Sequence, residues 1–432
     1  MRVTIATLGS RGDVQPFLAL AVALRRAGHA VRLATNEPFR GFVEAHEIEF
    51  APLGGDIKEI VGDAGRAALL AAHGRPLETF RALRRAVGPL VRQGISRLPA
   101  ALEGSEVVIG QLLVPAAEHY AEARGLPYID AAYVPVVPTR AFAHPGAPPN
   151  VPRGIASLCT HLAAEQVFWQ AFRAEVSAFR RDVLGVGRAS FFGPSARPLQ
   201  KRPPALLGYS NTLLPRAPDW PEHVVVTGPW LLDDATPWRP SPSLQAFLDA
   251  PGERPIYVGF GSMTVADPWK TTRLVRAAVA KAGARAVLAT GWGGLARDGD
   301  ADGDDCVCFI DEAPHQWLFA RVSAVVHHGG ASTTAECLRA GVPQLVVPFL
   351  GDQPFWGRTV ANAGLGPPPI AVGELTVDRL ADALRSLRDP KVARSAAQVG
   401  AQTRAESGAE LAAASLPRLV EHAHTKPRPR RS

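Results

Sequence analysis

The sequence predicts an α/β protein with two doubly wound domains that face each other across a cleft. Short apolar runs with strand character alternate with segments of helical period in both halves, which is the pattern of a parallel sheet covered by helices on both faces. A stretch rich in proline and polar residues, 231–254, separates the halves and is expected to be the linker. In the second half a buried strand runs into Gly329 and Gly330 and then into a helix, as at the ligand sites of such sheets.

The first domain is expected to cover residues 1–230. Its predicted strands are 3–8, 30–35, 107–113 and 128–133, and its predicted helices are 15–27, 116–124 and 155–184. Directly after the last of these strands, residues 133–152 give way to prolines and glycines. Such an excursion at the carboxyl end of a strand is where an open α/β sheet builds its ligand crevice.

The second domain is expected to cover residues 255–408. Its predicted strands are 255–260, 286–290, 306–310, 323–326 and 344–349, and its predicted helices are 269–282, 314–319, 331–340 and 353–363. A further helix is expected at 409–424, and a basic tail at 425–432. Two similarly wound halves fit two domains of the size that single cores usually reach.

The composition favours a soluble globular protein, with 47% apolar and 20% charged residues among 432. No apolar run is long enough to span a membrane, and the N-terminus reads as a core strand and not as a secretory signal, so the cytoplasm is the expected location and no stable membrane insertion is expected. The net charge is +7, partly from the tail, which is more often a frayed end than a binding segment. No basic stripe interleaved with aromatic residues occurs, so nucleic acid is not an expected partner.

The glycine turn of the second half predicts an anion site. The helix after it begins with Ser332, Thr333 and Thr334, so backbone amides, hydroxyls and the helix dipole converge there. Because no Lys or Arg lies between His327 and Glu336, His328 must assist the backbone, and the segment is not a Walker loop. The alternative is an ordinary connection in which the glycines only relieve strain; the added hydroxyls and histidines favour the anion site.

The loop at residues 9–16 carries Asp13 between the first strand and the first helix. Two interpretations remain open from the residues alone. Asp13 could be an N-cap carboxylate, which typically stabilises a helix by about 1 kcal/mol. It could also be a general base at the crevice, worth about 10²–10⁴-fold in rate.

Two other patterns resemble metal-binding motifs but are not interpreted as metal sites. Residues 298–303 resemble the start of a calcium loop, but Phe309 stands where the twelfth-position glutamate would be, so a solvated acidic loop is favoured. Cys306 and Cys308 lack zinc-finger spacing and are expected to be buried free thiols, while His327 is expected to be a packed residue.

Four segments, 9–17, 327–334, 340–344 and 352–357, together resemble the family 1 nucleotide-sugar glycosyltransferases, in the branch of sterol glucosyltransferases and glycopeptide-antibiotic glycosyltransferases. The resemblance spans nearly the whole chain in the right order. It implies the GT-B arrangement of two Rossmann-like domains, with the acceptor mainly on the N-terminal domain and the nucleotide sugar mainly on the C-terminal one. It also implies that helix 409–424 crosses back to the first domain.

The resemblance assigns roles by position. Asp13 would be the catalytic base and the loop residues Ser10 and Arg11 would lie on the acceptor side; the donor would be bound by Ser262, His328, Gly329, Gly330, Ser332, Thr333, Glu336, Asp352 and Gln353. Within that set, Ser262 and the glycine turn would hold the diphosphate, Glu336 the ribose, and Asp352 with Gln353 the sugar hydroxyls. Glu336 could instead be a first-turn helix carboxylate, and Asp352 could merely cap its helix.

The implied reaction is inverting transfer of a hexose without a metal or another cofactor. The partners would be a nucleoside-diphosphate sugar and a hydrophobic, hydroxylated small molecule such as a sterol, triterpenoid, polyketide or antibiotic aglycone. Plant members stack uracil on a Trp, but residues 312–315 hold no aromatic side chain of that kind, and Trp317 is expected to be core. This departure leaves uridine against thymidine open; UDP-glucose is the first expected donor and a dTDP-deoxysugar the second. A GT-B-shaped sugar-nucleotide epimerase and a non-catalytic partner protein of the same fold are the alternatives.

Overall fold

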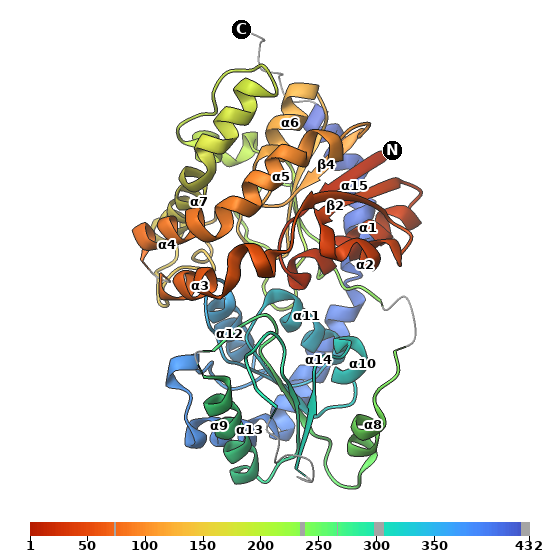
Figure 1. Ribbon diagram of the computed structural model, residues 1–432, viewed down its shortest axis with the longest axis vertical. Coiled ribbons are helices and arrows are strands. Elements are labelled where there is room, and N and C mark those ends of the chain that lie inside the picture. The colour runs from red at the N-terminus through yellow and green to blue at the C-terminus, as the bar shows by residue number, and fades with distance from the viewer. Residues whose placement is uncertain (73–74, 234–237, 266, 298–305, 425–432) are drawn as a thin grey trace. The chain divides into compact units, whose positions relative to one another are not determined.

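The structure is a computed structural model that describes residues 1–72, 75–233, 238–265, 267–297 and 306–424. The chain forms two compact units, each described here by itself (Figure 1). The first contains residues 1–211, 215–232 and 406–432, and the second contains residues 212–214 and 233–405. The acidic loop 298–303 falls within 298–305, and the basic tail is 425–432, so both lie outside the described residues.

The first unit is built on a parallel sheet with the strand order β3-β2-β1-β4-β5-β6-β7 among the described residues. Its strands are β1 (Arg2–Ala6), β2 (Ala30–Asn36), β3 (Glu49–Gly54), β4 (Val107–Gly110), β5 (Tyr128–Ala132), β6 (Ala205–Leu207) and β7 (Val224–Val226). Its helices are α1 (Arg11–Arg26), α2 (Arg40–Glu44), α3 (Ile57–Ala71), α4 (Pro76–Ala82), α5 (Gly88–Ala101), α6 (Ala116–Arg124), α7 (Ile155–Asp182) and α15 (Gly408–His424).

Helix α15 returns to the first unit from the far end of the chain. It packs against α1, beside which it lies in Figure 1. Leu416 and Leu419 of α15 are buried in one core with Ile5 of β1 and Phe17 of α1. The C-terminal helix is therefore part of the first unit's core.

The second unit is built on a parallel sheet with the order β10-β9-β8-β11-β12. Its strands are β8 (Ile256–Gly259), β9 (Ala286–Ala289), β10 (Val307–Ile310), β11 (Ala324–His327) and β12 (Gln344–Val346). Its helices are α8 (Pro242–Asp249), α9 (Pro268–Lys281), α10 (His315–Phe319), α11 (Ala331–Ala340), α12 (Gln353–Asn362), α13 (Val377–Leu387) and α14 (Pro390–Ala405).

In each sheet the strand that comes first in the sequence lies in the interior of the sheet, and later strands are added on both sides of it. The neighbours of β1 are β2 and β4, and the neighbours of β8 are β9 and β11. The loops that leave two such neighbouring strands turn to opposite faces of the sheet, so the backbone opens between them. Most candidate site residues follow the carboxyl ends of β1, β8 and β11, where this opening occurs, and Asp352 and Gln353 follow β12.

The structure corrects several boundaries. Helix α1 begins at Arg11 and not at residue 15, so Pro16 lies inside it and not in its first turn. The expected linker contains α8, and residues from Asp233 onward belong to the second unit. Cys306 is exposed because it precedes β10, whereas Cys308 is buried within that strand.

Candidate functional site

Asp13 lies in the first turn of α1, and its carboxylate folds back on the loop after β1. Oδ2 of Asp13 accepts hydrogen bonds from the Ser10 backbone N–H at 2.6 Å and from the Ser10 hydroxyl at 2.8 Å. Ser10 is therefore the N-cap, and Asp13 is the third helical residue reaching back to it, not the N-cap carboxylate considered from the sequence. Gly9 has a φ of +146°, and a side chain there would come within 2.4 Å of Asp13 Oδ2, so glycine is required for this carboxylate position.

The other carboxylate oxygen of Asp13 accepts a hydrogen bond from the hydroxyl of Tyr133. Tyr133 follows the last residue of β5, and its ring packs edge-on against Phe17 at a centroid distance of 6.2 Å. Sequence reasoning assigned no role to this tyrosine. Its place directly after a strand could have indicated one, because the carboxyl ends of parallel strands meet at one edge of a sheet.

Two buried amide side chains hold the loop that carries Ser10. Asn36, the last residue of β2, accepts a hydrogen bond from the Gly9 N–H at 3.0 Å. Gln111, after β4, donates from Nε2 to the Leu8 carbonyl oxygen at 3.1 Å. Arg11 is exposed and its guanidinium lies 5.0 Å from the centre of the Phe42 ring. The Asp13 carboxylate is thus held by residues after β1 and β5, and its loop by residues at the ends of β2 and β4.

His328 occupies the opening between β8 and β11 in the second unit. A side chain at Gly261, after β8, would lie 3.1 Å from His328 Cε1, and one at Gly330 would lie 2.5 Å from His328 Nε2. The imidazole is therefore seated between two glycines from neighbouring loops. Its Nδ1 is buried without a hydrogen-bond partner, and burial lowers the pKa of His328 to about 4. Ser262 follows Gly261 directly and is half-buried.

The turn after β11 requires its glycines and leaves the next helix without a side-chain cap. Gly329 has a φ of +90°, and a side chain there would come within 2.4 Å of Val346. Gly330 is the N-cap of α11, and no side chain caps that helix. Ser332 is half-buried and Thr333 buried in the first turn. The positive end of the helix dipole is thus presented beside His328, an arrangement suited to binding an anion.

His327 is a packed residue, as predicted. Its Nδ1 accepts a hydrogen bond from the Gly329 N–H at 3.1 Å, so Nε2 is the protonated nitrogen that donates to Gln344 Oε1 at 3.0 Å. Burial, followed by the neighbouring His328, lowers the pKa of His327 to about 3. This histidine stabilises the turn and does not face a ligand.

We expect the protein to lose stability on mild acidification. The folded state lowers the pKa of His327 to about 3 and of His328 and His144 to about 4, whereas an unfolded histidine has its ordinary value of 6.5. Below pH 6.5 the unfolded state therefore binds more protons, and each histidine costs about 1.4 kcal/mol per pH unit. The urea midpoint should fall between pH 6.5 and 5.5 and be insensitive to these groups between pH 7 and 8. An unchanged midpoint at pH 5.5 contradicts the prediction.

Glu336 lies in the second turn of α11, so the alternative of a first-turn helix carboxylate is wrong. It is only 5% exposed; its Oε2 accepts a hydrogen bond from Arg339 Nε at 2.9 Å and forms an ion pair with Nη2 of the same arginine at 2.6 Å. Arg339 also lies 3.2 Å from Asp233 Oδ1. The charge of this buried carboxylate is compensated within its own helix. Its expected contact with a ribose stays a prediction.

Asp352 and Gln353 stand at the start of α12. Asp352 occupies the N-cap position without capping through its side chain; its Oδ2 accepts a hydrogen bond from the Trp356 indole N–H at 2.8 Å. Gln353 is 5% exposed, and its Oε1 accepts from the backbone N–H groups of Phe349 and Leu350 at 2.7 and 3.1 Å. Its Nε2 reaches Met263 Sδ, beyond Ser262, at 3.4 Å. The first two bonds close the loop between β12 and α12, and the contact with Met263 ties the start of α12 to the loop after β8.

Residues 312–315, where plant members of the family carry a base-stacking tryptophan, lead into α10. His315 stacks on Phe319 at a centroid distance of 4.4 Å. Trp317 is half-buried and packs against Trp238 at 4.9 Å, with Arg321 over its ring at 4.1 Å. Trp317 is therefore part of the packing around this helix.

The loop at residues 133–154 is held by polar side chains, of which His161 and Thr139 are buried. His161 of α7 is 1% exposed, and its two ring nitrogens lie 3.3 Å from the Val136 carbonyl oxygen and 3.1 Å from that of Phe142. Asp219 accepts hydrogen bonds from the Thr139 hydroxyl and, at 2.8 Å, from the Arg140 N–H. The loop predicted to contribute to the ligand crevice is thus fixed to the body of its unit.

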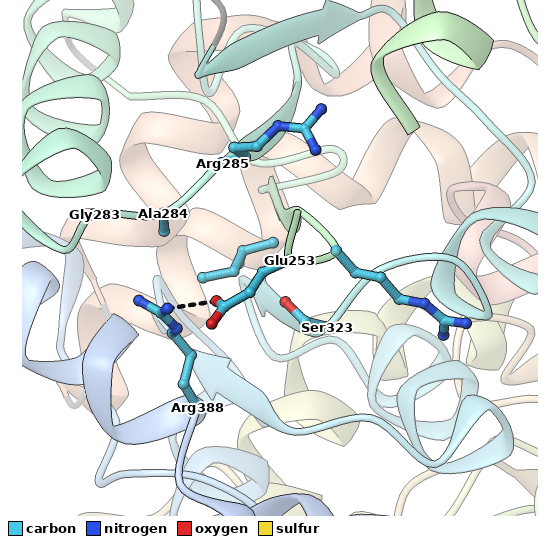
Figure 2. Close-up of a pocket in the computed structure, with 8 residues that line it drawn as sticks. Glu253, Gly283, Ala284, Arg285, Ser323 and Arg388 are labelled. Atoms are coloured by element: carbon cyan, nitrogen blue, oxygen red, sulfur yellow. Dashed lines mark ion pairs between the residues drawn. The ribbon is translucent and has the colours of Figure 1, made fainter. Parts of the chain in front are cut away.

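A separate pocket of about 160 Å³ lies at the end of the second sheet that is opposite to the candidate site residues (Figure 2). Arg285 and Ser323, in its lining, immediately precede β9 and β11, so the pocket is at the amino ends of the strands. Glu253 and Arg388 form an ion pair within it. It takes no part in the candidate site. The described residues contain no cluster of three or more potential metal ligands, and none of the described helices is long and apolar enough to cross a membrane.

Two domain families match the chain. Residues 3–143 match the glycosyltransferase family 28 N-terminal domain, and residues 296–417 match the C-terminal domain of the erythromycin biosynthesis protein CIII-like family.

Among curated relatives, a sterol 3-beta-glucosyltransferase of Cryptococcus neoformans var. neoformans serotype D is 36% identical, over 98% of this chain and 27% of its own length. A sterol 3-beta-glucosyltransferase of Arabidopsis thaliana is 34% identical, over 91% of this chain and 64% of its own. The chain thus spans less than two thirds of these relatives.

Solved structures show the same fold. The glycotransferase of kitacinnamycin superposes with a TM-score of 0.69 at 20% identity, covering 97% of this chain and 99% of that one. The glycosyltransferase VinC, solved in complex with dTDP, has a TM-score of 0.64 at 21% identity, covering 98% and 100%. The expectation of an α/β protein with two Rossmann-like domains of the GT-B type is confirmed.

Proposed function

Because the chain belongs to the family 1 GT-B glycosyltransferases, we propose that it transfers a hexose from a nucleoside-diphosphate sugar to a hydroxyl of a hydrophobic small molecule, with inversion at the anomeric carbon. Sugar transfer to such acceptors agrees with the sterol 3-beta-glucosyltransferases among its relatives and with the antibiotic glycosyltransferases that share its fold. Neither an epimerase nor a non-catalytic partner protein is favoured by these relatives.

The observation that carries the proposal is the environment of the His328 side chain. The ring lies between Gly261 and Gly330, with Nδ1 buried and unpartnered, beside the start of a helix without a side-chain cap. A diphosphate in this opening would accept hydrogen bonds from the neutral imidazole and from the first turn of α11, including Ser332 and Thr333. The departing diphosphate would be stabilised by groups already in place, which costs no reorganisation during the reaction.

Asp13 is the proposed general base in the first unit. Its carboxylate is oriented by Ser10 and by Tyr133. Oδ2 already accepts two hydrogen bonds from Ser10, whereas Oδ1 accepts one from Tyr133 and retains a further lone pair for the proton of an acceptor hydroxyl. The deprotonated oxygen would attack the anomeric carbon while the bond to the diphosphate breaks, and the leaving group would carry the electron pair away. The proton would remain on Asp13.

We also propose that the reaction needs neither a metal nor another cofactor and takes place in the cytoplasm. Backbone amides, hydroxyls and His328 would supply the stabilisation that a divalent cation provides to a departing diphosphate elsewhere. UDP-glucose is the first proposed donor and a dTDP-deoxysugar the second. The ribose is assigned to Glu336, and the sugar hydroxyls to Asp352 and Gln353.

Calorimetric titration of the protein with UDP and with dTDP, each in EDTA and again with magnesium, tests the proposal. We expect binding of one nucleotide that is equal in both buffers, followed by turnover of the corresponding nucleotide sugar only when a hydrophobic alcohol is added. Binding that requires magnesium rejects metal independence. Turnover without an acceptor indicates an epimerase, and failure of both nucleotides to bind rejects the donor site.

Substitution of His161 is expected to weaken binding of the acceptor and to leave binding of the nucleotide unchanged. Replacing this histidine with phenylalanine keeps an aromatic ring of similar size but removes both contacts to the carbonyls of residues 136 and 142. A loosened loop should raise the acceptor KM by about tenfold, since each lost buried hydrogen bond costs about 1 kcal/mol or more. Nucleotide affinity should be unchanged, and hydrogen exchange of residues 133–154 should accelerate. Cys159→Ser, at an exposed position of the same helix, is the control; an unaltered acceptor KM contradicts the prediction.

A further inference from the structure

Two phenylalanine side chains stand side by side on the surface of the first unit. Phe191 and Phe192 are each 58% exposed, and their rings meet edge to face with centroids 5.2 Å apart. A single exposed apolar side chain is ordinary in a globular protein. Two adjacent aromatic rings form a continuous apolar patch, and such patches mark surfaces that are covered by something else.

The backbone beneath these rings is anchored to α7. The Trp169 indole N–H donates to the carbonyl oxygens of Ser190 and Phe191 at 3.2 and 3.0 Å, and Gln170 Nε2 donates to the latter at 2.7 Å. Gln166 Nε2 donates to the Phe192 carbonyl oxygen at 2.8 Å. These bonds fix the segment with both phenylalanine rings outward, so their exposure is a property of the fold.

The turn after Phe192 also depends on this anchoring. Gly193 has a φ of +53°, and a side chain there would come within 2.4 Å of the Trp169 ring. Trp169 itself is only 5% exposed. The indole is thus buried under the turn while the two phenylalanines remain in solvent.

One cation lies over the pair, and others occur along the same segment of the sequence. The Arg173 guanidinium lies 4.9 Å from the centre of the Phe191 ring. The sequence from 183 to 218 contains no Asp or Glu. Two of its arginines are neutralised from outside, Arg197 by Glu118 and Arg202 by Glu165.

Two further cations of this segment keep their charge at the surface. Arg188 and Lys201 are exposed, and within the described part of the chain neither forms an ion pair. The segment therefore combines a rigid aromatic pair with uncompensated positive charge.

We propose that Phe191 and Phe192, with Arg173, Arg188 and Lys201, form a docking surface for an anionic lipid bilayer. A stable protein partner needs about 800 Å² from each side, far more than two half-exposed rings supply. Aromatic rings beside arginine and lysine are, in contrast, the composition that lies at the boundary of lipid headgroups and acyl chains. The cations attract anionic headgroups while the rings enter the boundary, so the contact is peripheral.

Sedimentation with vesicles tests the proposal without any donor or acceptor, so its outcome is independent of the proposed reaction. The full chain should bind vesicles of phosphatidylcholine containing phosphatidylglycerol, and bind pure phosphatidylcholine weakly. The double variant Phe191→Ser/Phe192→Ser should lower the partition coefficient by at least about tenfold. Arg188→Gln/Lys201→Gln should also lower it and reduce its dependence on salt.

The matched control is Trp269→Ser, since Trp269 is 48% exposed on α9 of the second unit. Its partition coefficient should equal that of the wild type, and all variants should keep the wild-type circular dichroism because the altered side chains are exposed. Absence of wild-type binding to anionic vesicles overturns the proposal. So does equal binding by the phenylalanine variant, or a self-association of the wild type that this variant abolishes, which would identify a second copy as the occupant.

Discussion

Replacing Asp13 with asparagine should lower kcat by about 10²–10⁴-fold while leaving nucleotide affinity unchanged. An asparagine oxygen can still accept the hydrogen bonds from Ser10 that position Asp13 Oδ2, and its amide can still meet the Tyr133 hydroxyl. The loop and the start of α1 should therefore survive, and the loss reports on proton transfer. Steady-state kinetics with a nucleotide sugar and a hydrophobic alcohol, together with calorimetric titration of the nucleotide, measures both quantities.

Tyr133→Phe is the companion variant for this prediction. It removes the hydroxyl that donates to Asp13 Oδ1 but leaves the carboxylate and its bonds to Ser10. If Asp13 is the base and Tyr133 only orients it, kcat should fall by about tenfold or less, because one hydrogen bond to a charged group is removed. An Asp13→Asn enzyme that retains wild-type turnover would show that the carboxylate serves only the helix start.

Replacing His328 with alanine should weaken nucleoside-diphosphate binding by about 10- to 150-fold, since a hydrogen bond to a charged group contributes about 1.5–3 kcal/mol. The imidazole is neutral at pH 7, because burial lowers the pKa of His328 to about 4, and its Nδ1 has no partner within the protein. Removing it therefore breaks no internal hydrogen bond through that nitrogen. Calorimetric titration with UDP and dTDP measures the loss.

Gly330→Ala tests whether the position of the ring matters as well as its presence. The added methyl carbon would lie 2.5 Å from His328 Nε2, so the ring must move even though the imidazole is kept. Nucleotide affinity should fall although no donor has been removed. If His328→Ala and Gly330→Ala both bind as tightly as the wild type, the diphosphate does not occupy this opening.

The second unit was predicted from sequence more fully than the first. Its short strands are buried apolar runs, and α11 has the predicted bounds of 331–340 because Gly330 and Gly341 mark both ends. In the first unit, no element was predicted between residues 36 and 107. There β3 is an edge strand containing Pro52, and α3 is interrupted at Gly62, which has a φ of +60°. Interrupted patterns of this kind carry little periodic signal.

The candidate site was predictable where its residues are neighbours in the sequence. His328, Gly329 and Gly330 form one turn, and glycine is needed there for reasons that a sequence can show. The specific contacts of Asp13 could not be read from neighbouring positions in the sequence, because Tyr133 and Asn36 reach it or its loop only through the strand order of the first sheet; the place of Tyr133 after a strand indicated at most that it lies at this edge. The pairing of Glu336 with Arg339 follows from helical spacing and could have been predicted.

The return of α15 to the first unit affects the order in which the protein can be completed during synthesis. Leu416 and Leu419, which fill the core beside α1, leave the ribosome only after residues 233–405 have been made. The second unit, by contrast, is drawn almost entirely from the continuous stretch 233–405. The first unit must therefore wait, with one apolar side of α1 uncovered, until the later-made unit has emerged. A fragment that stops near residue 232 would keep that surface exposed, so the first unit cannot be isolated by simple truncation there.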